Sequence, residues 1–433
     1  MHSSNKTLVL QDNTNIYDVI EKIVENPNYD EPFFICDIDQ LIWNVENWKR
    51  LMPRVEIFYA VKCNYNREVL ETFAALDLGF DCATMDEISK IIALDVSPNK
   101  IVFSNPTKII EHLEYAKQTG VRAMTFDNEE ELYKIKKHYP EAELLLRIRC
   151  DDESAKYVLG KKFGVLPGSE ALDLLRLAKQ LELTIIGVHF HVGSGCSDYY
   201  AYYKALCAAK GVFDAAIELG FPVKLIDIGG GYPGETINPI DKIAETTNAG
   251  LLDNFPDLSV KIIAEPGKYC CNTPYKLVTQ IHSKKIVIDE NNKKIRMYYV
   301  DVNVYNSLFS VLFGEYYKFR PVCENKNAQL HPCIIWGSTS DVNDKITDKF
   351  DYLPDLNIGD WLIVEETGAY TVSISCEYNG LSMPKSCAVI SKKNWSFLTT
   401  KAPKPIRKEK FTFSLNDFLK DRDQPAIFRK IYF

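Results

Sequence analysis

The chain has 433 residues, of which 46% are hydrophobic and 25% are charged, and its formal net charge is −8 at pH 7. This composition excludes wholesale disorder, and the length allows two domains or one large barrel with an addition. The net negative charge argues against a nucleic-acid partner, and the lack of a long apolar run argues against a membrane-spanning protein.

Strand-like apolar runs alternate with amphipathic helical patterns through the first two thirds of the chain. The candidate strands are Ile57–Val61, Gly79–Ala83, Ile101–Ser104, Ala123–Phe126, Leu144–Ile148, Ile185–Val192, Val223–Ile228 and Lys261–Ala264. Helical patterns separate them, for example Arg67–Leu76, Asp86–Leu94, Lys108–Gln118, Asn128–Lys136, Glu170–Leu181 and Tyr199–Leu219. This alternation predicts a parallel (β/α)8 barrel. An open Rossmann-like sheet is the rival interpretation, but no GxGxxG motif follows the first strand.

Polar residues and a glycine turn stand at the carboxyl ends of these strands, where a (β/α)8 barrel carries its chemistry. They are Lys62, Asp81, Asn105, Asp127, Arg147, His191, Gly229, Gly230, Gly231 and Glu265. A lysine at the end of a buried strand can form a Schiff base with a carbonyl cofactor, because desolvation keeps its amine nucleophilic. Taken alone, Lys62 fits better as a lysine that simply reaches the surface. The whole set of strand-end residues is what favours covalent chemistry.

From about residue 273 the pattern changes to short β-rich runs, which predict a second, mostly antiparallel β-domain. These runs are Tyr275–Ile281, Lys285–Val287, Met297–Val302, Cys333–Trp336, Trp361–Glu365 and Cys387–Ile390. We expect the barrel to span residues 34–272, and residues 1–33 and 273–433 to form the β-domain with a C-terminal tail. The cysteines show no CxxC spacing, which predicts reduced thiols in a cytoplasmic protein and no metal site.

These motifs, taken in order, resemble the eukaryotic ornithine decarboxylase family, which has the alanine-racemase-like fold and binds pyridoxal 5'-phosphate (PLP). The resemblance covers roughly residues 30–395 and rests on Phe58–Asn64, Gly79–Ala83, His191–Cys196, Gly229–Gly234, Glu265–Gly267, Trp336–Thr339 and Gly368–Thr371. It implies a PLP-dependent decarboxylase of an L-amino acid, a lyase that makes amines or polyamines. It also implies a homodimer with shared active sites.

The resemblance implies a role for each motif residue. Lys62 would form the Schiff base with PLP, Glu265 would pair with the pyridine nitrogen, and His191 would stack on the ring. The backbone of Gly229–Gly231 would approach the phosphate. Further cofactor contacts are implied for Asp81, Arg147, Ser194, Lys268 and Tyr370. Lys268 stands where the family has arginine, so we expect weaker or differently oriented phosphate binding. Singly, most of these residues also fit a purely structural role.

The chain departs from the family pattern in the motif that a partner subunit would supply. The family places a cysteine after Trp-Gly-x-Thr, whereas this chain has Ser340, followed by Asp341. In the family the thiol protonates the α-carbon after carbon dioxide leaves. A serine hydroxyl is much less acidic than a thiol, whose reference pKa is about 8.5. We therefore expect a diverted product, an aldehyde formed by decarboxylative transamination or by reaction with dioxygen. An amine formed with another proton donor is the alternative.

A second departure lies in the implied substrate pocket. The family carries a Tyr-Asp pair where this chain has Phe313 and Gly314, so an acid that would bind the distal amine of ornithine is missing there. Tyr378 replaces a phenylalanine, and Asp341 retains one acid. We expect a substrate that is larger or less cationic at its far end than ornithine, unless a backbone shift lets Glu315 restore diamine recognition.

The lost cysteine and the lost acid also fit an inactive regulator that resembles the antizyme inhibitors. Retention of Lys62, His191 and Glu265 favours an enzyme instead, because a binding protein needs neither a Schiff-base lysine nor a carboxylate for the pyridine nitrogen. The resemblance further allows an antizyme-like regulatory partner, but the matching segment Glu111–Lys134 is not distinctive.

Overall fold

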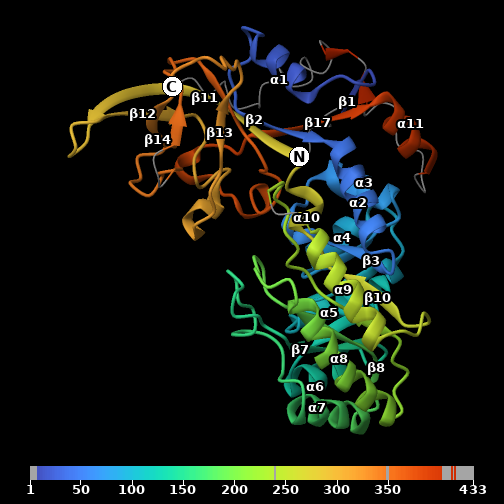
Figure 1. The fold of residues 1–433 in the computed structure, drawn as a ribbon. Coiled ribbons are helices and arrows are strands. Elements are labelled where there is room, and N and C mark those ends of the chain that lie inside the picture. The colour runs from blue at the N-terminus through green and yellow to red at the C-terminus, as the bar shows by residue number, and fades with distance from the viewer. Residues whose placement is uncertain (1–6, 238–239, 348–350, 402–410, 413, 416–433) are drawn as a thin grey trace, which may run out of the picture. The chain divides into compact units, whose positions relative to one another are not determined.

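A computed structural model describes residues 7–237, 240–347, 351–401, 411–412 and 414–415. The chain divides into two compact units (Figure 1). One unit consists of residues 43–270, and the other consists of residues up to 42 together with those from 271 onward. Within the described ranges, no helix combines the length and the apolar character needed to cross a lipid bilayer.

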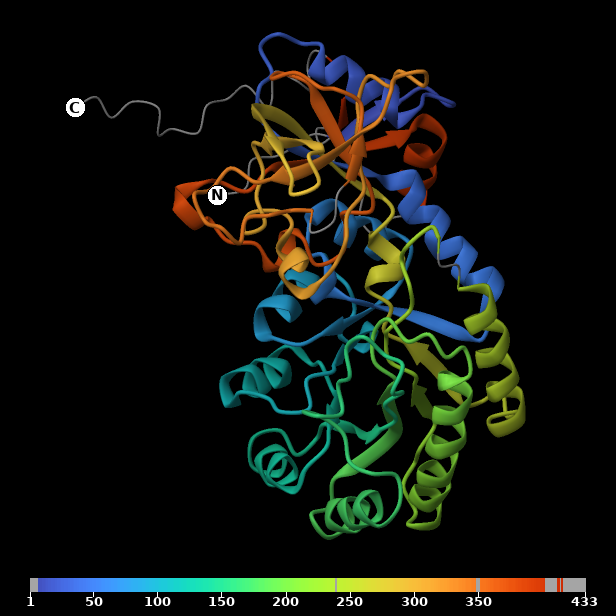
Figure 2. The same cartoon turned by 60° about the vertical axis from the view of Figure 1, so that its left-hand side comes forward.

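The first unit is a closed barrel of parallel strands, which confirms the predicted barrel. Around the barrel the strands are β10 (Lys261–Ala264), β3 (Val55–Ala60), β4 (Gly79–Cys82), β5 (Ile101–Phe103), β6 (Ala123–Phe126), β7 (Glu143–Arg149), β8 (Thr184–His191) and β9 (Leu225–Asp227). The connecting helices lie outside the strands (Figure 2) and are α3 (Arg67–Ala75), α4 (Met85–Ile92), α5 (Ile110–Thr119), α6 (Glu129–His138), α7 (Ser169–Gln180), α8 (Ala201–Glu218) and α9 (Asp241–Asn254).

The local sequence explains these elements. The strands β4, β5 and β9 are buried at every residue, as expected where helices cover one face of a sheet and side chains fill the other. Helix α4 begins with a cap related to the capping box: the N-cap Thr84 accepts the Glu87 N–H at 3.2 Å, and the Glu87 carboxylate accepts the N–H of Ala83, the residue before the N-cap, at 2.5 Å. This cap directs the chain from the end of β4 into the outer layer.

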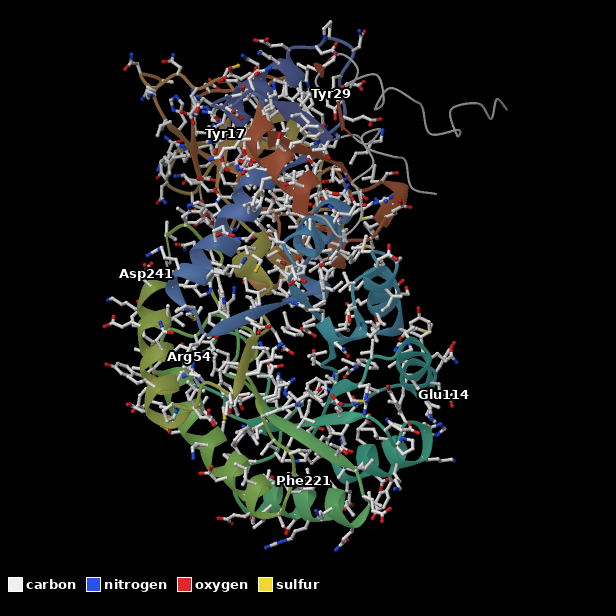
Figure 3. The ribbon with its side chains drawn as sticks, turned by 90° about the vertical axis from the view of Figure 1, so that its right-hand side faces the viewer. Tyr17, Tyr29, Arg54, Glu114, Phe221 and Asp241 are labelled. Carbon is white, nitrogen blue, oxygen red and sulfur yellow. The ribbon has the colours of Figure 1, made fainter. Side chains whose placement is uncertain are left out.

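The barrel closes between β10 and β3, which are neighbours despite lying about 200 residues apart in sequence. Arg54 supports this closure (Figure 3), because its guanidinium donates to the carbonyl oxygens of Phe255 at 2.8 Å and Asp257 at 3.3 Å. The guanidinium therefore joins the residue before β3 to the segment that leads into β10.

The second unit contains a mixed sheet, largely antiparallel around its longest strand, as the sequence predicts. The sheet order is β15 (Asp351–Leu353), β14 (His331–Trp336), β12 (Lys294–Val300), β11 (Tyr275–Ile288), β2 (Phe33–Asp37), β17 (Lys385–Ser391), β1 (Thr7–Leu10) and β18 (Phe411–Thr412). Two more strands continue from β11, namely β16 (Trp361–Val364) and then β13 (Phe319–Pro321). The N-terminal strand β1 pairs in parallel with β17.

The remaining helical segments are short except for α2. They are α1 (Ile16–Val24), α2 (Ile38–Leu51), α10 (Lys268–Cys271), α11 (Lys392–Lys401), and the 3-10 turns η1 (Val61–Cys63), η2 (Pro98–Lys100), η3 (Phe309–Phe313), η4 (Val372–Ile374) and η5 (Tyr378–Gly380). Helix α1 packs Ile20 and Ile23 into the core of the second unit. On the same helix, the Tyr17 hydroxyl (Figure 3) donates to Glu365 at 3.1 Å, and the Arg320 guanidinium lies 4.3 Å from the ring centroid of Tyr17.

Candidate active site

Lys62 lies at the carboxyl end of β3, but the strand itself ends at Ala60 and the lysine belongs to the 3-10 turn η1. Its Nζ donates to Oδ2 of Asp81 at 2.6 Å. The Lys62 side chain is 45% exposed, whereas the Asp81 side chain is fully buried and also accepts the Ser104 hydroxyl. Burial raises the pKa of Asp81, and Glu265 raises it further, against the opposing effect of Lys62. The lysine amine is therefore held by a buried acid yet remains accessible.

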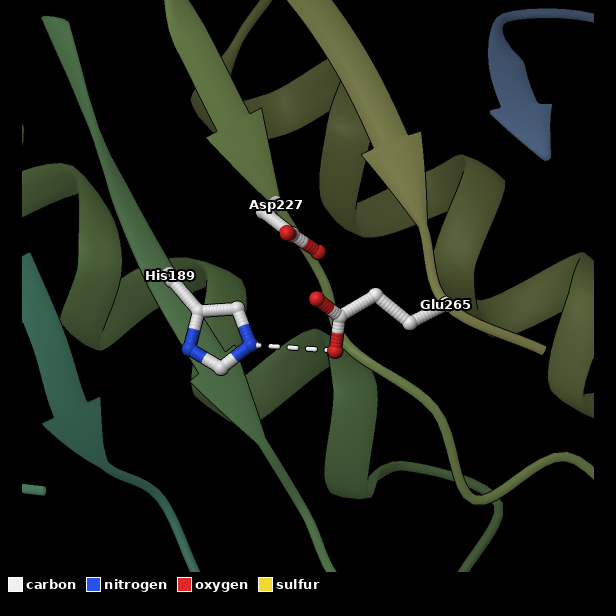
Figure 4. A group of neighbouring side chains, drawn as sticks. All are labelled: His189, Asp227 and Glu265. Atoms are coloured by element: carbon white, nitrogen blue, oxygen red, sulfur yellow. Dashed lines mark hydrogen bonds and ion pairs between the residues drawn. The ribbon is translucent and has the colours of Figure 1, made fainter. Parts of the chain in front are cut away.

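Glu265, His189 and Asp227 meet inside the barrel at the ends of three adjacent strands (Figure 4). His189 Nε2 and Glu265 Oε2 are 3.3 Å apart. Burial lowers the pKa of His189 against the opposing effect of Glu265, and its Nε2 N–H donates to the Glu265 carboxylate. Burial alone would raise the pKa of Glu265, but His189 and then Lys62 hold it well below its usual range. Glu265 is therefore a buried carboxylate with lone pairs left for another donor.

Among the described residues, His189, Asp227 and Glu265 also form a group that could hold a metal ion, because their candidate ligand atoms lie within 4.8 Å of one another. Glu265 also fits a pyridine nitrogen, because a buried carboxylate with a lowered pKa stabilises a protonated ring nitrogen.

Arg147 and His191 stand beside this cluster on β7 and β8. The Arg147 guanidinium lies 5.2 Å from the ring centroid of Phe163. Burial lowers the pKa of Arg147, and Glu265 and Asp127 oppose that effect. The Nδ1 atom of His191 accepts the Gly193 N–H at 2.9 Å. Burial and then Arg147 lower the pKa of His191 to about 3, so its ring is neutral at physiological pH.

The glycine turn Gly229–Gly231 packs against the ends of β8 and β10 so closely that side chains do not fit. A Cβ on Gly229 would lie 2.2 Å from the Phe190 carbonyl oxygen, and a Cβ on Gly230 would lie 2.6 Å from that of Glu265. The Tyr202 hydroxyl donates to the Gly230 carbonyl at 2.8 Å and fixes the orientation of that peptide. A turn without side chains lets a phosphate group approach the backbone closely, so Gly229–Gly231 suits that role.

The other predicted phosphate contacts differ in their surroundings. Lys268 forms an ion pair with Glu235. Ser194 exchanges backbone hydrogen bonds with Tyr157, at 3.0 and 3.2 Å. Tyr370 lies in the second unit with a φ of 52°, and its carbonyl accepts the Ser310 hydroxyl at 3.0 Å. The expectation that Lys268 meets a phosphate differently from the family's arginine stays a prediction.

Ser340 and Asp341 lie on an ordered loop of the second unit. Buried Asp344 organises the loop, because its carboxylate accepts the N–H groups of Val304 and Thr339, each at 2.9 Å. Ser340 is exposed at the tip of the loop. The Tyr305 hydroxyl donates to Asp341, and this bond raises the pKa of Tyr305 to about 12.

Three residues remain of the predicted substrate pocket, and two of them, Phe313 and Gly314, follow each other at the end of η3. The Phe313 side chain is 57% exposed. Gly314 has a φ of 77°, and a Cβ there would meet no atom within 4 Å. On η5, Tyr378 places its ring centroid 4.5 Å from that of Tyr305. The structure thus brings Tyr378 and Asp341 together through Tyr305.

The sequence analysis missed four residues of these sites: His189, Asp227, Tyr202 and Tyr305. Two of them carried a readable signal. His189 stands two residues before His191 on the same face of β8, and Asp227 ends β9 two residues before the selected Gly229. No comparable signal marked Tyr202 or Tyr305, whose contacts depend on the tertiary fold.

Comparison with known proteins agrees with this geometry. The family described as "Pyridoxal-dependent decarboxylase, pyridoxal binding domain" matches residues 38–272. An ornithine decarboxylase of Caenorhabditis elegans is 39% identical over 376 residues, which are 84% of this chain and 89% of that protein. Antizyme inhibitor 2 of Xenopus laevis is also 39% identical, over 84% of this chain and 82% of its own. The crystal structure of the Paramecium bursaria Chlorella virus arginine decarboxylase bound to agmatine has a TM-score of 0.82 at 34% identity and covers 86% of this chain and 100% of that chain.

The chain therefore belongs to the ornithine decarboxylase family of PLP-dependent decarboxylases, and its barrel is the pyridoxal-binding domain. The residues present fit the cofactor: Lys62 for its aldehyde, Glu265 for its ring nitrogen and the glycine turn for its phosphate. When bound, PLP supplies an electron sink for charge that develops at the α-carbon of an amino acid. The relatives include both decarboxylases and an antizyme inhibitor, so membership alone does not decide whether this chain is catalytic.

Proposed function

We propose that the protein is a PLP-dependent decarboxylase of an L-amino acid with a long cationic side chain. The observation that carries this proposal is the charged set at the strand ends, in which the accessible amine of Lys62 contacts buried Asp81 while Glu265 remains an anion inside the barrel. An inactive regulator related to the antizyme inhibitors would need none of these costly buried charges for binding a protein partner. The regulator is therefore the second candidate, and retained PLP binding discriminates between them.

The surroundings of Asp341 support a substrate larger than ornithine. Asp341 is accompanied by a series of aromatic rings, in which Tyr305 lies 4.5 Å from Tyr378 and 6.4 Å from Phe309 between centroids. Aromatic faces beside one acid attract a broad, delocalised cation such as guanidinium. Gly314 is exposed and has no side chain, so this position would not block a longer substrate side chain. We expect arginine to be consumed at least as fast as ornithine.

Ser340 supports an altered fate for the substrate after carbon dioxide leaves. An alcohol is a poor general acid, so the α-carbon would lack an efficient proton donor. Two balanced outcomes give an aldehyde one carbon shorter than the substrate. In the first, the amino acid and PLP yield the aldehyde, carbon dioxide and pyridoxamine phosphate. In the second, the amino acid, dioxygen and water yield the aldehyde, carbon dioxide, ammonia and hydrogen peroxide.

Mass spectrometry of the products tests this function. PLP-loaded protein would be incubated in air with ornithine, lysine, arginine and the aromatic amino acids. We expect an aldehyde from a basic amino acid. An amine alone would reject the diverted chemistry but keep the decarboxylase, and no product from a protein that also fails to hold PLP would favour the regulator.

Ser340→Cys provides the sharper test of the proton donor. The thiol should raise the ratio of amine to aldehyde by about 100-fold, the lower end of what a positioned general acid contributes. Ser340→Ala is the matched control and should leave the ratio near that of the parent protein, because it removes the hydroxyl without adding an acid. An unchanged ratio in Ser340→Cys would contradict the assignment of Ser340.

We further propose a homodimer with two shared active sites, in which one protomer supplies Lys62 and its partner supplies Ser340 and Asp341. Mixing equal amounts of Lys62→Ala and Asp341→Ala proteins should recover about a quarter of the parent activity, because half of the dimers are mixed and each has one intact site. Each variant alone is the control. Mixed dimers, verified by differently tagged chains, that recover no activity would argue against shared sites.

A further inference from the structure

Two buried carboxyl groups face each other in the barrel interior, and the site described so far uses only one of them. Asp227, the last residue of β9, is fully buried, and Glu265 after β10 is 6% exposed. Figure 4 shows the Asp227 carboxyl group directed at the nearer oxygen of Glu265. Their ligand-type atoms lie within 4.8 Å of each other.

Each acid has one oxygen with a hydrogen bond and one without. Asp227 Oδ1 accepts the Gly229 N–H at 2.9 Å, and Glu265 Oε2 accepts from His189 Nε2 at 3.3 Å. Asp227 Oδ2 and Glu265 Oε1 are buried and have no hydrogen-bond partner among the described residues. A buried polar atom without a partner is costly, and here two such atoms belong to facing groups.

A single proton between the two acids would satisfy both oxygens. Two ionised carboxylates at this separation would repel each other in a medium where neither is hydrated, so one of them takes up a proton. The surrounding charges indicate which one. Glu265 receives a hydrogen bond from His189 and interacts with Lys62, both of which favour its anion. For Asp227, burial raises the pKa well above its ordinary value, and Glu265 and then Asp81 raise it further, against the hydrogen bond from Gly229.

We propose that Asp227 is a neutral carboxylic acid that donates its O–H to Glu265 Oε1 and thereby orients Glu265 as an anion. Asp227 is then a positioning residue, because it acts on the cofactor only through Glu265. The proton remains on Asp227 throughout. A carboxylate has about four lone-pair positions, so the bonds from His189 and Asp227 leave room for a ring nitrogen.

This arrangement matters for the reaction because an ionised Asp227 would drive Glu265 to take up the proton. A protonated Glu265 could no longer hold a positive charge on the pyridine nitrogen, and the electron sink would weaken. The inference rests on the proposed cofactor role of Glu265, but the protonation of Asp227 can be measured without cofactor or substrate.

Infrared spectroscopy of the full-length protein without PLP is the first test. At pH 8 we expect a carbonyl band of a protonated carboxyl group that shifts in deuterium oxide and is lost in Asp227→Asn. Asp253→Asn, at an exposed position, is the control and should keep the band. If Asp227→Asn loses no such band, the proposal is overturned.

The second test uses two variants of similar size and compares their affinity for PLP by spectroscopic titration. In Asp227→Asn, the amide N–H replaces the acid O–H and the amide oxygen still accepts from Gly229, so the affinity should stay within about twofold of the parent. Asp227→Leu offers no donor, and the affinity should fall about ten- to hundredfold, the usual effect of a hydrogen bond to a charged group.

Two results would contradict the shared proton. If the affinity for PLP fell equally in Asp227→Asn and Asp227→Leu, the negative charge of Asp227 would be what PLP binding needs. Stoichiometric metal in the purified protein, lost in Asp227→Asn, would mean that a cation joins His189, Asp227 and Glu265. Failure of the decarboxylase proposal is distinguishable, because the infrared band and its loss do not depend on any product being formed.

Discussion

Lys62→Ala should lower the decarboxylation rate on the order of 10⁴-fold or more, because it removes the amine that we propose attaches the cofactor covalently. The absorption band of the Schiff base should disappear at the same time. Borohydride reduction of the parent protein, followed by peptide mapping, should place the reduced cofactor on Lys62. Asp81 would lose its cationic partner in this variant, so Lys62→Arg serves as a second variant that keeps a charge near Asp81.

Lys108 is the matched control for this experiment, because it is the lysine that a pKa criterion would choose. Burial lowers the pKa of Lys108 to about 8, so a larger fraction of its amine is neutral at physiological pH than for an ordinary lysine. Its side chain is however fully buried, pairs with Glu131 at 2.9 Å and donates to the Thr125 carbonyl at 2.6 Å. Access therefore decides between the two lysines. Lys108→Met should retain the Schiff base, and cofactor reduced onto Lys108 would contradict the assignment of Lys62.

The barrel could be predicted from sequence because buried parallel strands leave a strong local signal. Strands such as β5 and β10 are short apolar runs between amphipathic helices, and their positions follow from the pattern alone. The ends of strands are set by more distant contacts. Lys62 falls in the turn η1, where the Tyr59 hydroxyl donates to the Asn64 carbonyl at 2.9 Å. Nothing in the local pattern specifies that bond.

Of the candidate site, only the residues that directly follow the strands could be predicted from the sequence. Residues directly after the strands, such as Lys62 and Glu265, stand out because polar groups interrupt apolar runs. The supporting residues are harder to find from sequence. Tyr202 belongs to the first turn of α8, and its bond to Gly230 exists because α8 packs against the barrel beside β8. The ion pair between Asp81 and Lys62 likewise depends on the register of β4 against β3, which pairs Asp81 with Ala60.

Gly231→Ala should abolish tight PLP binding and destabilise the barrel. The φ of Gly231 is 103°, a region that L-residues rarely adopt, and a Cβ there would lie 2.1 Å from the Gly193 carbonyl oxygen. The backbone strain alone costs about 1 to 3 kcal/mol, and relief of the clash must move the turn that we assign to the phosphate. We expect PLP affinity to fall at least about 100-fold, measured by spectroscopic titration, and the urea midpoint of unfolding to fall with it.

Gly211→Ala is the control for the loss of a glycine as such, because Gly211 lies inside α8 and a Cβ there would meet no atom within 4 Å. Alanine favours a helix by about 0.5 to 1 kcal/mol relative to glycine, so this variant should gain stability and bind PLP normally. The two substitutions add the same methyl group, and opposite effects would therefore separate backbone conformation from side-chain size. If Gly231→Ala binds PLP as well as Gly211→Ala does, the phosphate does not rest on the glycine turn, and that role would have to pass to other backbone of the barrel.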